Sequence, residues 1–330
     1  MSRKNLLLMA TLFCCVLLIP AASNISIAAA GTYDDFPTRN IEFIIGWGPG
    51  GGTDLFVRTI NVDVREILGG NIIEHNMPGG SSVVAMQHVL QQPADGYTIF
   101  GITNDIILNT LLGRTEMSYR DLMPIIRAHV DIGAFHVANA HARFTTFDEF
   151  VEYARANPGR VTLAGIGYQS NDHFLSFYAL RQMGIEVTYV PYESASDMLA
   201  ALLGGHVDMM YEEPGIVIES LRAGTITPIL FFTDEQVAAF PDVPTLGQLG
   251  YSIPPYMWRG VAVRAGTPDG IVQKLIDAYV KAWHGERYTE FARDRLLDLT
   301  DGLLTGHDFL ESMSRDTEIM IGIMEDLGYR

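Results

Sequence analysis

The 330-residue sequence predicts an α/β fold made of two lobes that face a common cleft. Segments with strand-like and helix-like hydrophobic patterns alternate along the chain, which is typical of a mostly parallel sheet covered by helices on both faces. The alternation occurs in two successive stretches of the chain. In both stretches a buried strand ends in a glycine-rich loop that opens a helix, at residues 46–54 and 165–170.

The first thirty residues are expected to lie outside this fold. Arg3 and Lys4 make a basic start, residues 6–19 are apolar, and Ala28-Ala29-Ala30 offers a small-residue cleavage site. The apolar stretch is too short to span a bilayer comfortably, so we interpret the segment as a secretory signal rather than an uncleaved membrane anchor. This predicts export to the periplasm, with cleavage near Ala30.

Cysteine usage and charge exclude several classes of function. Cys14 and Cys15 both lie in the leader, so the mature chain has no disulfide, no thiol nucleophile and no thiolate metal site. The bulky Phe13 before Cys14 argues against lipid attachment. The net charge of −17 argues against nucleic acid and anionic membrane surfaces as partners. Because this charge also repels anions at long range, an anion site must be built locally, from backbone dipoles or a few side chains.

The elements of the first stretch follow from its periodicity. Strands are expected at residues 41–45, 71–74 and 97–102, and helices at 54–68 and 82–92. The first helix has an apolar face at Phe56, Ile60, Val64 and Ile67, and Gly69-Gly70 ends it. This order predicts parallel strands connected by helices.

The second stretch has the same pattern, and the chain ends in helices. Strands are expected at residues 134–137, 161–165, 186–190, 207–211 and 227–232, and helices at 146–157, 171–183, 196–203 and 215–223. Three more helices are expected at 268–283, 286–297 and 307–327, where Met313, Met320 and Met324 fill the core. We therefore expect one lobe from residues 31–130 with 255–330, and the other from 131–254.

The loop at residues 46–54, Gly-Trp-Gly-Pro-Gly-Gly-Gly-Thr-Asp, is a candidate anion site. A helix that opens directly after glycines leaves several backbone N–H groups free, and its N-terminus carries partial positive charge. Gly46, Gly48 and Gly51 also satisfy the dinucleotide pattern G-x-G-x-x-G. A nucleotide is disfavoured because Pro49 removes an N–H, export leads away from nicotinamide cofactors, and no P-loop lysine follows. A small carboxylate remains, and no cofactor is expected.

Catalytic motifs are missing from the sequence. It contains no G-x-S-x-G and no H-E-x-x-H, and His136 and His141 do not share a helical face, so no metal site is expected. Glu212-Glu213 is a paired-carboxylate candidate, but adjacent strand residues point to opposite faces, which predicts one cleft residue and one solvated residue. We therefore expect a binding protein rather than an enzyme, in which two glycine loops hold the two ends of a short diacid and close by a hinge.

Several segments resemble one family. They are Phe36-Pro37-Thr38-Arg39-Asn40-Ile41, Pro49-Gly50-Gly51-Gly52-Thr53-Asp54, Asn76-x-Pro78-Gly79-Gly80, Asp95-Gly96-Tyr97-Thr98, Gly167-x-x-Ser170-x-x-His173, Pro191-Tyr192, the run 201–208, Pro241-Asp242-Val243-Pro244-Thr245, Gly250-Tyr251 and Gly266-Thr267-Pro268. In order and spacing the chain resembles the substrate-binding proteins of tripartite tricarboxylate transporters, also called Bug receptors. The resemblance covers nearly all of the mature chain.

The resemblance implies a two-lobed periplasmic-binding-protein fold, type II-like, with the ligand in the inter-lobe cleft. It implies a monomer without enzymatic activity that delivers a small organic carboxylate to the integral membrane subunits of a transporter. The carboxylate would be a di- or tricarboxylate, an aromatic acid or an acidic amino acid. The carboxylate would be held by backbone N–H groups and waters, with little help from arginine. Two alternatives stay open: a stand-alone ligand sensor for a signalling kinase, and a secreted hydrolase or nucleotide-binding enzyme.

Candidate ligand-binding residues follow from the same resemblance. One wall would contain Trp47, Gly48, Gly50, Gly51, Thr53 and Asp54, joined by Thr103 and Asn104. The other would contain Gly167, Ser170 and Asn171, with Tyr192 and Asp208 near the cleft. Glu212 adds acid beyond Asp208, Gln169 replaces a usual glycine, and Glu193-Ser194 replaces a more basic pair. These departures indicate either surface drift or a changed ligand, with Trp47 stacking on an apolar body or a glutamate meeting an amino group.

Overall fold

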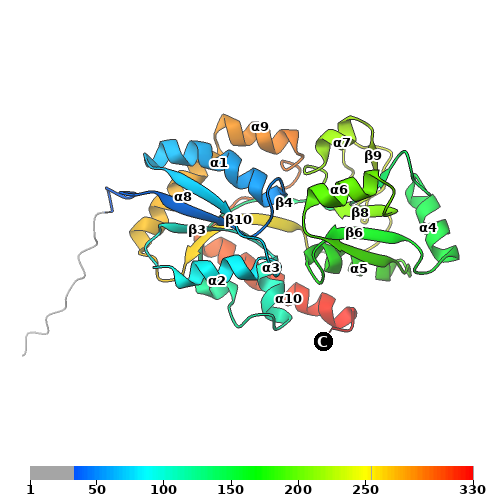
Figure 1. Ribbon diagram of the computed structural model, residues 1–330, viewed down its shortest axis with the longest axis horizontal. Helices are drawn as coiled ribbons and strands as arrows, with labels where there is room; N and C mark the ends of the chain where they lie inside the picture. The colour runs from blue at the N-terminus through cyan, green and yellow to red at the C-terminus, as the bar shows by residue number, and fades with distance from the viewer. Residues whose placement is uncertain (1–32, 254, 330) are drawn as a thin grey trace, which may run out of the picture. The chain divides into compact units, whose positions relative to one another are not determined.

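Two β-sheets with helices around each of them organise the chain (Figure 1). A computed structural model describes residues 33–253 and 255–329, so the expected signal peptide and its cleavage site lie outside the described residues. No helix in the described part of the chain is both long and apolar enough to cross a membrane.

The first sheet has six strands in the order β11-β4-β10-β3-β1-β2. The chain enters it through β1 (Ile41–Ile45), α1 (Gly52–Leu68), β2 (Ile72–Asn76), α2 (Val83–Gln91), β3 (Thr98–Thr103), α3 (Asp105–Leu111), a 3₁₀ turn (Tyr119–Asp121) and β4 (Leu122–Asp131). It returns at the end through β10 (Met257–Arg264), α8 (Asp269–Trp283), α9 (Glu286–Asp294), β11 (Leu304–Thr305) and α10 (Gly306–Asp326).

The second sheet has five strands in the order β7-β6-β8-β5-β9. Its elements are β5 (Ala134–Ala138), α4 (Phe147–Ala156), β6 (Thr162–Ile166), α5 (Asn171–Gln182), β7 (Thr188–Tyr192), α6 (Ala195–Leu203), β8 (Met209–Glu212), α7 (Ile218–Arg222) and β9 (Ile226–Phe231). The expected order of strands and helices is confirmed in this stretch. Thr146 caps α4 as expected, because its hydroxyl accepts a hydrogen bond from the Glu149 N–H at 3.3 Å.

The parallel part of each sheet is three strands wide. β1 is parallel to β2 and β3, and β6 is parallel to β7 and β8. The antiparallel pairs are β10 with β3 and β4, β11 with β4, and β5 with β8 and β9, so the sheets are mixed and not mostly parallel as expected. Strands β4 and β10 were not among the expected elements, although their burial is nearly continuous. The chain leaves the first sheet after Asp131 and enters the second at Ala134; after β9 it returns to the first sheet at Met257. The lobe boundaries themselves remain a prediction.

Both faces of the first sheet are covered. Phe43 and Ile45 of β1 belong to a core cluster with α1 and α8, whereas Ile44 belongs to a cluster with α2 and α10. This is the two-residue alternation of a strand that is buried on both faces. Figure 1 shows α1 and α8 on one side of the strands and α2, α3 and α10 on the other.

Helix α10 packs on both sheets. Its Met313 belongs to a core cluster of the first sheet, whereas Met320 and Met324 belong to the core cluster around the second. The expectation that these methionines fill the core is confirmed. This one helix therefore contributes buried side chains to the core clusters of both sheets.

Candidate functional site

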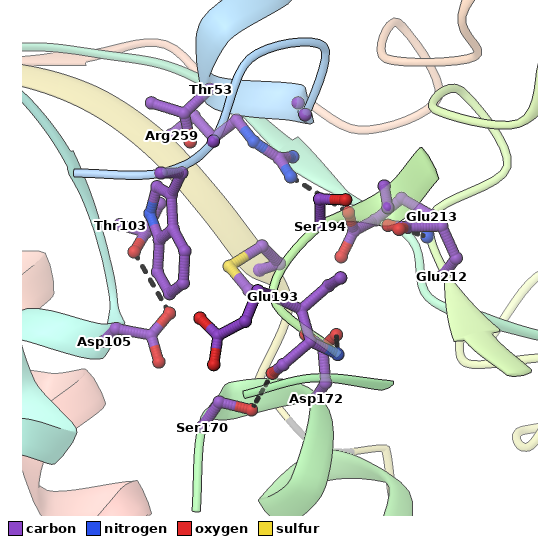
Figure 2. A pocket seen from close by; sticks show the side chains of 17 residues that line it. Thr53, Thr103, Asp105, Ser170, Asp172, Glu193, Ser194, Glu212, Glu213 and Arg259 are labelled. Atoms are coloured by element: carbon purple, nitrogen blue, oxygen red, sulfur yellow. Dashed lines mark hydrogen bonds and ion pairs between the residues drawn. The ribbon is translucent and has the colours of Figure 1, made fainter. Parts of the chain in front are cut away.

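A pocket of about 580 Å³ lies between the carboxyl ends of strands from both sheets (Figure 2). Parallel strands end at a common edge, so the segments after β1, β3, β6 and β8 all reach it. The pocket is lined by Trp47, Gly48, Gly51, Gly52, Thr53, Thr103, Asp105, Ile166, Ser170, Asp172, Glu193, Ser194, Ala195, Glu212, Glu213, Met257 and Arg259.

The wall from the first sheet is the glycine loop and the start of α1. A Cβ atom on Gly46 would lie 1.8 Å from the Ser82 hydroxyl oxygen, and one on Gly52 would lie 2.3 Å from Arg259 Nη2. Only glycine allows the loop to run this close to both side chains. Gly51 precedes the helix without a side-chain cap. Among the described residues, no acceptor contacts the N–H of Gly51, Gly52 or Thr53, so this helix terminus offers free donors.

Asp54 holds the same loop in place from inside. Its carboxylate accepts hydrogen bonds from the Gly50 N–H at 2.9 Å, from Arg58 Nε at 2.8 Å and from Asn76 Nδ2 at 2.9 Å. Asn76 also donates to the Trp47 carbonyl at 3.0 Å. The Gly50 N–H therefore already has the Asp54 carboxylate as its acceptor, and neither residue lines the pocket.

The wall from the second sheet is the start of α5, where several N–H groups already have protein acceptors. The Ile166 N–H donates to Asp172 Oδ2 at 2.8 Å, and the Gln169 N–H donates to His173 Nδ1 at 3.0 Å. The Asn171 N–H donates to Asp105 Oδ1 at 3.2 Å, so a carboxylate from α3 crosses the pocket to cap α5. This helix terminus differs from α1, because a protein carboxylate already accepts from its first N–H, although the Asp172 N–H has no acceptor among the described residues.

The structure brings seven of the fourteen expected residues to the pocket and leaves seven away from it. Those that line it are Trp47, Gly48, Gly51, Thr53, Thr103, Ser170 and Glu212. Gly167 and Tyr192 line an adjoining cavity together with Trp47 and Glu193. Asn104, which donates to the Tyr256 carbonyl at 3.2 Å, and the fully buried Asn171 also do not line the pocket.

Asp208 lies at the other end of β8 from Glu212. It precedes the strand, where its carboxylate accepts from the Thr162 N–H at 2.9 Å and pairs with Arg143 at 2.5 Å. β8 runs parallel to β6, so both strands have their carboxyl ends at the pocket. Asp208 precedes β8 and therefore lies at the opposite edge of the sheet. The strand direction alone separates these two acids.

Five carboxylates line the pocket: Asp105, Asp172, Glu193, Glu212 and Glu213. The expectation that one of the adjacent glutamates is solvated is wrong, because both are buried. Glu212 is the last residue of β8 and Glu213 follows it, so strand alternation no longer governs the pair. Burial, together with the charge of Glu213, raises the pKa of both Glu212 and Asp172 well above the ordinary range.

Arg259 is the one cation among the lining residues, and the sequence did not single it out. Its Nη2 donates to Glu213 Oε2 at 2.9 Å, and its Nη1 pairs with Asp131. The residue is 6% exposed, and Nε has no hydrogen-bond acceptor within the described part of the chain. A lone arginine in the apolar run 257–263 is the signal that could have found it. Gly52 lies in the glycine loop that the sequence did single out, whereas Asp105 and Asp172 carry no such local signal.

Figure 2 shows how the charged side chains are distributed. Arg259 lies near Thr53 at one end of the view, whereas Asp172 and Ser170 lie at the other. Glu212, Glu213 and Glu193 lie between them, and no group of histidine, cysteine and carboxylate side chains that could hold a metal occurs among the described residues. The arrangement offers donors on one wall and acceptors on the other, which suits binding of a small polar molecule.

Comparison with known proteins identifies what this chain is similar to. A family model described as "Tripartite tricarboxylate transporter family receptor" matches residues 56–302. A protein encoded in the gbd 5′ region of Cupriavidus necator is 32% identical over 78% of this chain and 78% of its own length. A TctC solute-binding protein from Polaromonas is 26% identical with a TM-score of 0.66, covering 88% of this chain and 99% of that one. A protein of R. palustris, solved with adipate, is 25% identical with a TM-score of 0.79, covering 88% and 98%.

Proposed function

This chain belongs to the tripartite tricarboxylate transporter receptor family, and on that premise we propose that it captures a small organic acid in the pocket between its two sheets. The protein acts outside the cytoplasm, in the periplasm, and delivers the acid to the integral membrane subunits of its transporter. It works as a monomer that closes its two lobes, residues 31–130 with 255–330 and residues 131–254, over the ligand.

The free N-terminus of α1 is the observation that supports this function. The N–H groups of Gly51, Gly52 and Thr53 have no acceptor among the described residues, and all three residues line the pocket. A helix dipole at such a terminus stabilises an anion by about 0.3–1 kcal/mol, and by up to about 2 kcal/mol when partly buried. A ligand carboxylate placed here satisfies donors that the fold leaves open. The related R. palustris protein, whose structure contains adipate, is consistent with an acid as ligand.

The site also includes residues that surround this terminus. Trp47 is half-buried, lines the pocket and packs against the core of the first sheet, so its ring is held in place beside the ligand. Thr103 and Ser170 line the pocket from the two walls, with hydroxyls that already donate to Asp105 and to the Ile166 carbonyl, and Arg259 stands next to Gly52. Because Glu213 and Asp131 already neutralise Arg259, the carboxylate relies chiefly on backbone donors.

A thermal-shift screen tests the function. Mono-, di- and tricarboxylates, aromatic acids and amino acids are added to the purified protein, and the ligand class is the one that raises the Tm in a concentration-dependent way. An ester- and phosphate-hydrolysis assay on the same sample separates a receptor from an enzyme. The proposal fails if no carboxylate raises the Tm.

A matched pair of variants at Gly51 tests the placement of the carboxylate. Gly51→Pro removes one N–H at an extended backbone position, whereas Gly51→Ala keeps it, and the added Cβ lies at an ordinary 3.6 Å from the Gly48 carbonyl oxygen. Loss of one hydrogen bond to a charged group costs about 1.5–3 kcal/mol, so the proline variant should bind at least tenfold more weakly. Equal affinity in both variants would place the carboxylate elsewhere.

A further inference from the structure

The two helix termini that face the pocket are not equivalent. At α1 the N–H groups of Gly51, Gly52 and Thr53 are free among the described residues. At α5 the Asn171 N–H is satisfied by Asp105, and the Ile166 N–H just before the helix is satisfied by Asp172. A ligand with carboxylates at both ends would find three free N–H groups at α1. At α5 it would find protein carboxylates, with only the Asp172 N–H lacking an acceptor among the described residues.

The charge of the pocket has the same asymmetry. Glu213 is paired with Arg259, but no cationic side chain pairs with Asp105, Asp172, Glu193 or Glu212 within the described chain. Asp172 and Glu212 each use one carboxylate oxygen for a backbone N–H, from Ile166 and Glu213 respectively. The second oxygen of each has no protein donor among the described residues, so these oxygens can accept hydrogen bonds from a ligand.

Arg259 provides an independent indication of a ligand. Its side chain is more than nine-tenths buried, and its Nε has no hydrogen-bond acceptor in the part of the chain that the structure describes. The guanidinium touches Gly52 closely enough that a Cβ there would lie 2.6 Å from Nε. One N–H of an otherwise paired guanidinium thus lacks an acceptor at the α1 end of the pocket, opposite the acids of α5 and β8.

We propose that the ligand carries a cationic nitrogen as well as a carboxylate, so that it is an amino acid-like zwitterion and not a plain di- or tricarboxylate. Its carboxylate binds at the start of α1 beside Arg259, and its ammonium group binds between Asp172 and Glu212. This inference rests on the proposed function, because it takes the pocket as the ligand site.

The competing arrangement is a diacid whose second carboxylate meets protonated acids. Glu212 is faced by Asp172 on α5, by Glu213 after β8 and, more remotely, by Arg259 on β10, while Asp105 on α3 lies near Asp172. A bound ammonium group stabilises ionised Glu212 and Asp172, so the protein releases protons when it binds a zwitterion. A diacid requires these groups to stay protonated, so its binding takes up protons or leaves them unchanged.

Matched probes distinguish the two arrangements. We use 4-aminobutyrate, 5-aminopentanoate and the common α-amino acids, each paired with the monocarboxylate that lacks the amine and with the dicarboxylate of similar length. The tightest amino acid should bind at least tenfold more tightly than either of its partners. The inference is overturned if a dicarboxylate or the deaminated acid binds as tightly, whereas the proposed function survives that result. Failure of every acid to bind would sink the proposed function as well.

Two variants test the placement of the nitrogen. Glu212→Gln and Asp172→Asn each remove a charge and keep the size of the side chain. Each should reduce the preference for the amino acid over its deaminated partner at least tenfold, while affinity for the deaminated acid is kept or increased. Glu235→Gln, at an exposed position, is the matched control and should leave the preference unchanged. An unchanged preference in both pocket variants would contradict the placement.

Proton exchange provides a readout that does not depend on folding of a variant. Calorimetric titration of the wild-type protein with the best amino acid, in phosphate and in Tris at the same pH, reports the protons released or taken up. We expect net release for the amino acid. Net uptake, or none, would support the diacid arrangement instead.

Discussion

Arg259 on β10 donates to Glu213 at 2.9 Å, and this buried ion pair connects a strand of the first sheet to the segment that follows β8 in the second. The two side chains are 7% and 4% exposed. Asp131, at the end of β4, is the second partner of the same guanidinium. One cation therefore neutralises carboxylates from both halves of the molecule.

Removal of this cation should destabilise the protein strongly. In Arg259→Met, Glu213 and Asp131 are left buried without a counter-charge, which costs about 3–5 kcal/mol. Arg39→Met is the control, because Arg39 and Asp95 form an exposed pair at 3.0 Å and such pairs are worth at most about 1 kcal/mol. Urea unfolding of both variants measures the difference. Equal stability would show that Arg259 is not needed to neutralise the cluster.

Gly52 should not tolerate a side chain, although it begins a helix. A Cβ there would lie 2.3 Å from Arg259 Nη2, and the guanidinium cannot easily move because two carboxylates hold it. Overpacking of this kind costs about 1–3 kcal/mol, so Gly52→Ala should lower both the free energy of unfolding and ligand affinity. Gly51→Ala, where the nearest atom is 3.6 Å away, should change neither. Similar behaviour of the two variants would rule out the close contact.

Local sequence patterns predicted the strands, loops and helices that form this site better than they predicted its charged residues. The strand Ile41–Ile45, the loop after it and the start of α5 are local features, because glycines, a capping serine and hydrophobic periodicity lie within a few residues of each other. The contact of Asp105 with α5 and the position of Arg259 depend on how distant segments pair. Nothing near either residue in the sequence encodes that pairing.

Strand direction explains two further differences between expectation and structure. Asp208 and Glu212 are at opposite ends of β8, and only the carboxyl end of a parallel strand meets the pocket. Glu213 is buried because the strand ends before it, so alternation between two faces stops there. Both distinctions were open to sequence reasoning, but they required the exact end of a four-residue strand. Element boundaries are the least certain part of such predictions.

Asp54 should stabilise the glycine loop although it does not line the pocket. Asp54→Ala removes an acceptor from the Gly50 N–H, from Arg58 and from Asn76, and leaves partly buried donors unpaired. We expect a loss of about 1–3 kcal/mol in the free energy of unfolding. Asp63→Ala on the same helix loses a more exposed pair with Arg287 and should cost at most about 1 kcal/mol. Faster hydrogen exchange at residues 46–52 in Asp54→Ala alone would locate the effect in the loop.

Arg114 should slow ligand release. It follows α3, donates to the Tyr168 carbonyl at 2.8 Å and, from its other terminal nitrogen, to Asn109 at 3.2 Å, so it holds the loop before α5 against the other half of the molecule. Because affinity differences between related complexes lie mostly in dissociation, Arg114→Ala should raise the off-rate about tenfold with little change in the on-rate. Stopped-flow measurement with the identified acid checks this. Arg160→Ala, at an exposed position, should leave both rates unchanged.

Glu212 should make the stability of the ligand-free protein depend on pH in a defined direction. Burial and the charges of Glu213 and Asp172 raise the pKa of this carboxyl well above 4.5. Between 4.5 and the raised value the folded state binds a proton that the unfolded state lacks, so the free energy of unfolding falls as pH rises through that window. Below the window both states are protonated, and Glu212 makes no pH-dependent contribution.

Comparison with Glu212→Gln isolates the direction in which Glu212 changes the free energy of unfolding with pH. His136 and His173, whose pKa burial lowers to about 4, act in the opposite sense, because their contribution is lost as pH falls below about 6.5. Both histidines are present in the wild type and the variant, so their contributions largely cancel in the difference. The stability of Glu212→Gln relative to wild type should therefore rise with pH above 4.5, at up to about 1.4 kcal/mol per pH unit, and then level off. Urea unfolding from pH 4.5 to 8 measures this difference; a flat line, as expected for Glu235→Gln, would mean that Glu212 is ionised in the folded protein throughout.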